Sequence, residues 1–354
     1  MLWITLADLR FRARQFLIAM LGAALVFAMT LLLAGLSAGF RDEINQTVQG
    51  FGATAWVVHS GSAGRVTSFT PLPATIVPGV KQAKGVTQAN PAVIVPVPAV
   101  KGTNSASIHS SDVVLVGQTP SGEMHQTLLS GHWPSAPGQA VVDTDFSVAI
   151  GQHITVSGRV FRVVGLIGDR TLLGGSPLVF VTLSDAQGIA FGEHSSISAI
   201  LVMGTPTHLP HGLVAYSNSR VELSSLDQMS GAVSSVDSAR SFMWIIATII
   251  VAALVYVSAL ERTKDFAILR ALGASKSALF LSLAGEAVAV SVMAAAAALV
   301  IANYMTGIFA LRVDIPISSY ATLPLSACLV GLVAALVTLR RAVGVDPSTA
   351  FAEP

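Results

Sequence analysis

The second long apolar run of the chain reads FMWIIATIIVAALVYVSAL, at positions 242–260. It has no charged residue, and it is long enough for an α-helix to cross the roughly 30 Å hydrocarbon core of a bilayer. Three further runs of similar character lie at 16–36, 279–302 and 321–339, and Glu286 is their only charged residue. The sequence therefore predicts an α-helical membrane protein with four transmembrane helices.

A large domain is predicted between the first and second spans. This interval is rich in Gly, Pro, Ser and Val and holds all eight histidines. Short β-type runs lie at 55–58, 113–117, 140–143, 153–156, 160–165 and 178–181. The pair Ser157-Gly158 is typical of a hairpin turn, and Ser184 is expected to cap a short helix at 185–190. Helical extensions of the spans are expected at 40–49 and 224–240, forming a stalk below an α+β domain.

Composition excludes several classes of protein. Apolar residues make up 53% of the chain and charged residues 11%, with a net charge of +1, which gives no basic face for nucleic acid. The single cysteine, Cys328, lies in the last span, so no intrachain disulfide can form. The first run could be a cleaved signal peptide, but its apolar stretch is longer than such segments usually have. We expect an uncleaved anchor.

Basic residues predict the orientation of the spans. Arg and Lys cluster in the segments before the first span, between the second and third spans, and after the fourth, whereas the loop 305–320 holds only Arg312. Positive segments favour the cytoplasm. We therefore expect both termini in the cytoplasm and the large domain outside, with these boundaries: cytoplasmic segments 1–15, 261–278 and 340–354; spans 16–39, 242–260, 279–304 and 321–339; extracytoplasmic parts 40–241 and 305–320.

Three stretches resemble one known family. The segment LERTKDFAILRALGA at 260–274 resembles the cytoplasmic signature of FtsX-like ABC transporter permeases. The runs at 129–133, 151–156 and 161–165 are similar to that family's MacB-like periplasmic core, and VDPSTAF at 345–351 is similar to its usual ending. The size and the DFA variant of the signature are closest to the short DevC/HrtB-like branch, which includes mycobacterial permeases.

The resemblance implies a function. It implies a permease subunit of the type VII, mechanotransmission class of ABC transporter, an exporter driven by a separate ATP-binding subunit in the bacterial plasma membrane. The chain has no G-x-x-x-x-G-K-[ST] phosphate loop, so ATP is expected on the partner and no cofactor on this chain, which we expect not to be an enzyme. The alternative is an FtsX-like transmitter that activates an extracytoplasmic partner without transport. A sensor without an ATPase is disfavoured, because the cytoplasmic segments are too short for a signalling domain.

The segment between the second and third spans is the expected docking site for the ATPase. If it is helical, Phe266, Leu269 and Leu272 form an apolar stripe that suits a groove on a soluble protein. An interfacial helix lying on anionic lipid is the alternative. The residues that we assign to docking are Glu261, Arg262, Asp265, Phe266, Leu269, Arg270, Leu272 and Gly273.

Two further features carry expectations. Glu286 lies inside the third span, where an ionisable side chain usually faces protein. We favour a structural carboxylate paired with a basic residue such as Arg270 or Arg14 over a proton-linked role. The histidines are expected to be solvated rather than to bind metal. Finally, four helices are few to enclose a route. Small residues in spans one and two, which include Gly22, Ala24, Ala28, Ala247 and Ala253, predict a homodimer packed through these spans and their stalks.

Overall fold

The computed structural model describes residues 13–103, 110–119, 128–168, 170–261, 268, 272–273, 275–306 and 313–342. Contacts divide the chain into two compact units. We call Met1–Gly39 with Ala232–Pro354 the helical unit and Phe40–Gly231 the β unit. Helix α2 (Ala13–Gly50) continues from the first unit into the second.

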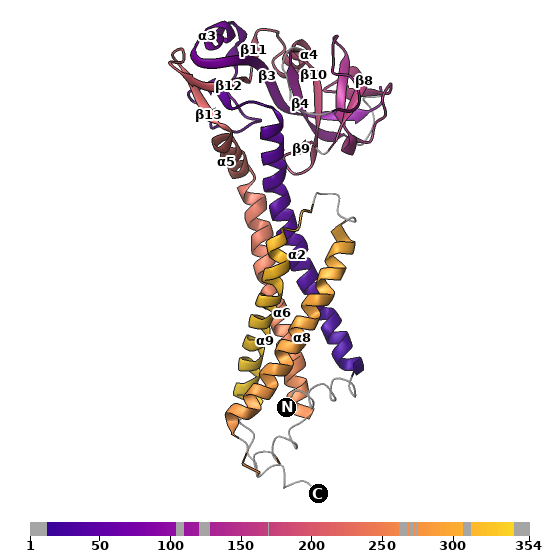
Figure 1. Ribbon diagram of the computed structural model, residues 1–354. Helices are drawn as coiled ribbons and strands as arrows, with labels where there is room; N and C mark the ends of the chain where they lie inside the picture. Colours follow the sequence, from indigo (N-terminus) through magenta and orange to yellow (C-terminus); the bar gives the residue numbers. More distant parts are fainter. Residues whose placement is uncertain are drawn as a thin grey trace. The chain divides into compact units, whose positions relative to one another are not determined.

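The helical unit contains the four candidate spans (Figure 1). Besides α2, they are α6 (Ser230–Glu261), α8 (Lys276–Met305) and α9 (Ile317–Ala342), and by length and composition each can cross a membrane. Alanines fill much of their common core, including Ala24, Ala247, Ala294 and Ala327, each almost fully buried. Small side chains let helix backbones approach closely in a membrane.

This packing occupies part of the small-residue surface that the sequence offers to a second copy. Ala24, Ala28 and Ala247 are fully buried among the helices of this same chain, so they are not available to a second copy. Helix α6 also exposes large side chains, including Phe242, Ile245 and Ile249. Of the small residues in the first two spans, Gly22 and Ala253 remain exposed, so a dimer packed through these spans stays a prediction.

The β unit is built on one large mixed sheet (Figure 1). Its strand order is β13-β1-β12-β3-β4-β10-β6-β8-β5, with β7 paired to β3 and β8, β9 paired to β10, and β2 and β11 forming a separate pair. The pairs β4/β10 and β6/β8 are parallel and the others are antiparallel. The strands are β1 Ala55–His59, β2 Leu72–Pro73, β3 Lys84–Lys101, β4 Ser111–Gln118, β5 Leu128–Gly131, β6 Gln139–Asp143, β7 His153–Val156, β8 Arg159–Ile167, β9 Thr171–Leu172, β10 Ser176–Thr182, β11 Ser196–Ile197, β12 Ala199–Thr207 and β13 Leu213–Ser217.

Both faces of this sheet are buried, which explains its continuous apolar strands. Successive side chains of a strand point to opposite faces, so Val57 joins one core cluster and Trp56 the other. Helices α3 (Val77–Lys81) and α4 (Leu183–Ala190) contribute to the first cluster. The end of α2 and α5 (Asn218–Gln228) contribute Ile44, Val48 and Val221 to the second. The expected α+β domain is therefore confirmed.

Two sequence predictions differ from the structure in detail. The side chain of Thr182, not Ser184, accepts the amide of Asp185 and caps α4, because the helix begins at Leu183. The second stalk helix is not continuous from 224 to 240. Helix α5 ends at Gln228 and α6 begins at Ser230, so one residue, Met229, separates them. The extension of the first span through 40–49 is confirmed.

Candidate functional site

The segment between α6 and α8 is described only in part. The α6 helix ends at Glu261, and α8 begins after Ser275, whose hydroxyl accepts the amide of Ala278 at 3.2 Å. Between them, the amide of Leu272 donates a hydrogen bond to the carbonyl of Ile268 at 3.0 Å, four residues earlier, as in an α-helix. Gly273 follows with φ of 90°, a conformation that stops a helix and favours glycine.

Its described apolar side chains are exposed. Leu272 is 80% exposed and Ile268 is 54% exposed, and their spacing of four places them on one helical face. The docking role assigned to Leu272 stays a prediction. Arg262, Asp265, Phe266, Leu269 and Arg270 lie outside the described residues, so the predicted stripe stays a prediction. The predicted stripe begins at Phe266 and does not include Ile268. The four-residue spacing between Ile268 and Leu272 is the sequence feature that indicates a shared helical face.

Glu286 is almost completely buried within the helical unit. Its side chain is 2% exposed, and the hydroxyl of Ser258 on α6 donates to its Oε1 atom at 2.6 Å. This hydrogen bond between two packed helices helps to compensate the cost of burying a carboxyl group. The predicted basic partners, Arg14 and Arg270, have side chains outside the described part of the chain. The structure thus adds Ser258 as a neighbour on another helix.

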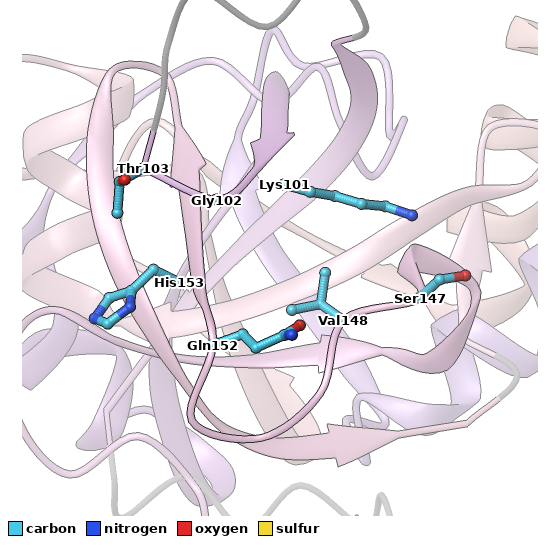
Figure 2. Close-up of a pocket in the computed structure, with 7 residues that line it drawn as sticks. All are labelled: Lys101, Gly102, Thr103, Ser147, Val148, Gln152 and His153. Carbon is cyan, nitrogen blue, oxygen red and sulfur yellow. The ribbon is translucent and has the colours of Figure 1, made fainter.

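The β unit has an open hollow of about 490 Å³ near the loop between β6 and β7 (Figure 2). Lys101 and His153 extend toward opposite ends, with Gln152 and Val148 between them. The Lys101 ammonium group lies 5.9 Å from the centroid of the Phe146 ring. Ser147, Thr103 and Gly102 complete the lining. The hollow offers one ammonium group, an imidazole, hydroxyls and an amide, with the side chain of Val148 among them.

The described histidines of the β unit belong to no candidate metal site. Among the described residues, no group of three His, Cys, Asp or Glu side chains is placed to hold a metal ion. The Nδ1 atom of His194 lies within hydrogen-bond distance of the Ser184 hydroxyl. The Nδ1 atom of His59 accepts a hydrogen bond from the amide of Gly61. His109 and His125 lie outside the described residues.

Family comparisons cover most of the chain. Residues 16–210 match the MacB-like periplasmic core domain, and residues 239–347 match the FtsX-like permease C-terminal family. Two uncharacterized ABC transporter permeases of Mycobacterium tuberculosis (strain H37Rv) are 33% and 32% identical over 354 residues, which is 100% of each chain. A permease of Mycobacterium bovis is also 33% identical over the full length of both.

Solved structures show more distant likeness. The extracellular domain of YknZ, a noncanonic ABC-type transporter from Gram-positive bacteria, is 14% identical with a TM-score of 0.32, covering 43% of this chain and 83% of that one. The periplasmic region of MacB from Actinobacillus actinomycetemcomitans is 13% identical with a TM-score of 0.35, covering 51% and 96%.

Proposed function

This chain belongs to the FtsX-like family of ABC transporter permeases with a MacB-like periplasmic core, and from that premise we propose that it exports a substrate by moving its β unit. Membership implies a multi-pass membrane protein and an ATP-binding subunit as partner. In the proposed mechanism that subunit binds and hydrolyses ATP in the cytoplasm. This chain binds no cofactor of its own and converts closure of the ATPase into movement of an extracytoplasmic domain.

The observation that carries this proposal is the continuity of α2. Its 38 residues correspond to about 57 Å of helix, nearly twice the ~30 Å thickness of a hydrocarbon core. Phe27 and Leu31 are buried in the helical unit, whereas Ile44 and Val48 are buried in the core of the β unit. Because one unbroken helix has buried anchors in both units, a displacement of its membrane part reaches the β unit directly.

The packing of the last two spans supports a lever rather than a pore within one chain. A Cβ atom added at Gly331 of α9 would lie 2.8 Å from the Cα atom of Val288 and 2.9 Å from the carbonyl carbon of Ala287 on α8. The two backbones are therefore in direct contact. In this mechanism the substrate is taken up by the β unit on the outer side and does not pass between α8 and α9.

Orientation follows from charge. We propose that both termini and the segment 261–273 are cytoplasmic, since Arg and Lys concentrate there and positive short segments stay inside. The β unit is then extracytoplasmic. Its nine Lys and Arg residues do not oppose this, because long domains cross the membrane largely regardless of charge.

We propose that the working complex contains two copies of this chain and two ATPase subunits. Four spans per chain provide few helices for a transport complex, and α6 exposes a stripe of large apolar side chains (Phe242, Ile245, Ile249). These residues recur at three- and four-residue spacing, which makes one face of the helix. The stripe is the surface that we assign to the second copy.

The ATPase docks on the exposed face that contains Ile268 and Leu272. A buried apolar contact tolerates a charge poorly, so Ile268→Asp or Leu272→Asp should abolish co-purification of the ATPase while the chain still inserts in the membrane. Leu129→Asp is the matched control, because Leu129 is 65% exposed but lies in the β unit. A complex that forms normally with both docking variants would contradict this assignment.

Signalling to an extracytoplasmic partner is the second candidate, and the α2 lever serves it equally well because no passage through the helices is needed. The two functions predict different effects in cells whose only copy of this chain is inactive. Export predicts that a compound accumulates in cells that carry only the Leu272→Asp variant. Signalling predicts no such compound but a change in an extracytoplasmic enzyme, such as a hydrolase of the cell wall.

A further inference from the structure

The end of α2 is fastened to one tight turn of the β unit. Glu43 accepts the amide of Gly174 through Oε2 at 3.1 Å and the amide of Gly175 through Oε1 at 2.8 Å. One turn farther along the same face, the hydroxyl of Thr47 donates to the carbonyl of Thr171 at 2.8 Å. Strand β9 and the turn that follows it thus share three hydrogen bonds with two side chains of one helix.

The turn has an unusual backbone that is shaped for an anion. Leu173, Gly174 and Gly175 have φ values of 58°, 80° and 93°, three successive residues in the left-handed region. Such a conformation is uncommon for a large aliphatic residue and persists only where the surroundings hold it. Successive amides in a concave turn form a nest for a negative group, and here the Glu43 carboxylate occupies it.

Burial distinguishes Glu43 from its neighbours. Its side chain is 7% exposed, whereas Arg41 and Asp42 on the same helical turn are exposed. A buried carboxylate is costly unless hydrogen bonds compensate for the lost water. Glu43 lies with Ile44, Thr47 and Val48 on the buried face of α2, where the amides of Gly174 and Gly175 supply that compensation.

The turn also contacts the other helical connection and the main sheet. A Cβ atom added at Gly174 would lie 3.3 Å from the side chain of Met229, at the break between α5 and α6, and 3.5 Å from that of Phe40 on α2. Just before β9, the amide of Arg170 donates to Asp143 at 2.6 Å. Asp143 is fully buried at the end of β6. Hydrogen bonds therefore connect α2 to the main sheet, from Thr47 to Thr171 and from the adjacent Arg170 to Asp143.

We propose that the Leu173–Gly175 turn and Glu43 form the joint through which α2 moves the β unit. Glu43 is a positioning residue in this joint: it keeps the helix and the sheet moving as one body. Because α5 and α6 are separated at Met229 while α2 is unbroken, α2 is the driving helix and the Met229 break lets the other connection bend. This inference rests on the proposed function, in which ATP hydrolysis moves the β unit.

The test uses the full chain in complex with its ATPase. Glu43→Gln keeps the size of the side chain, but the amide has only one acceptor oxygen, so the NH₂ group would face one of the two turn amides. Asp42→Asn is the matched control. Gly175→Ala is the second variant, since a residue with φ of 93° strains with any side chain and should disturb the same joint from the other partner.

Two measurements test the joint: hydrogen exchange at the turn amides and the distance between spin labels on the two copies. Hydrogen exchange at the Gly174 and Gly175 amides should be slow in the wild type and Asp42→Asn, and at least tenfold faster in Glu43→Gln. A spin label at Gln88, an exposed residue of β3, should report an ATP-driven distance change between the two copies. That change should fall by at least half in Glu43→Gln and Gly175→Ala, with assembly and ATP hydrolysis retained.

The proposal is contradicted if amide exchange in Glu43→Gln equals that of the wild type. It is also contradicted if the ATP-driven distance change is undiminished in Glu43→Gln and Gly175→Ala. If the wild type itself shows no response to ATP, the proposed function fails, and exchange at the two amides alone then decides whether Glu43 fastens α2 to the turn.

Discussion

At the scale of single residues, buried polar groups of the helical unit differ in whether they have a partner. Ser258 donates to Glu286 between α6 and α8, and both side chains are buried. Ser291, also on α8, is completely buried, and its hydroxyl has no hydrogen-bond partner among the described residues. These two serines make a matched pair for testing what the contact with Glu286 contributes.

We predict that Ser258→Ala lowers the stability of the helical unit by about 1 kcal/mol, because hydrogen bonds between membrane helices contribute that order of free energy. The reciprocal change Glu286→Ala should cost at least as much, since it also removes packing. Ser291→Ala should be neutral or slightly stabilising. Reversible unfolding of the purified chain in mixed micelles measures the three differences, and an equal loss in Ser258→Ala and Ser291→Ala would contradict a specific role for Ser258.

Residue-level roles were only partly readable from the sequence. An intramembrane glutamate is rare, so Glu286 could be picked out, whereas its neighbour Ser258 is one of several serines in apolar runs. Glu43 could not be found, because a glutamate in an expected stalk helix reads as solvent-exposed. Only the pair Gly174-Gly175 indicated a special turn, and nothing in the sequence joins it to a residue 131 positions earlier.

At the scale of elements, close helix packing makes α9 sensitive to added volume. Gly331→Ala would place its methyl group against the backbone of α8, where no side chain can move aside. We predict a loss of about 1–3 kcal/mol, the usual cost of overpacking. Gly285→Ala is the control, because a Cβ atom there meets nothing within 4 Å.

The measurement is thermal unfolding of both variants in the same detergent. The Gly285→Ala variant should melt at or slightly above the wild-type temperature, in keeping with the better helix propensity of alanine. Equal melting temperatures for the two variants would show that α8 and α9 do not approach as closely as described.

The least predictable element was β3, the long strand at the centre of the sheet. It contains Pro91, Pro96 and Pro98, which normally argue against a central strand. The register explains them: β12 pairs with β3 up to Ala92, and β4 pairs with it from Ala92 onward. Each proline therefore lies where β3 has one of these two neighbours but not the other. By contrast, strands β6, β7, β8 and β10 could be predicted because they are short, apolar and separated by turn residues.

At the scale of the whole molecule, the four spans and the inserted domain were predictable, because the length of an apolar helix is set by the bilayer. The split of the second stalk helix at Met229 was not, since neither proline nor a marked change in composition announces it. The turn that fastens α2 depends on contacts between distant segments. Such contacts are decided by the fold and leave no local pattern in one sequence.

Membrane topology is predicted from charge and can be tested on the whole chain. In a Cys328→Ala background, His153→Cys in the β unit should react with a membrane-impermeant thiol reagent in intact cells, because His153 is exposed. Ser277→Cys, also exposed but at the start of α8, should react only after the membrane is opened. The reverse pattern would mean that the chain is inserted with the β unit in the cytoplasm.

The central claim is that ATP hydrolysis on a partner subunit moves the β units of two paired copies. The most direct measurement is the distance between spin labels at Gln88 of the two copies, in a Cys328→Ala background, in the reconstituted complex. The account predicts one distance distribution without nucleotide and a shifted one when ATP is trapped on the ATPase. A distribution that is identical in both states while ATP is hydrolysed, or a complex that holds a single copy of the chain, would contradict it.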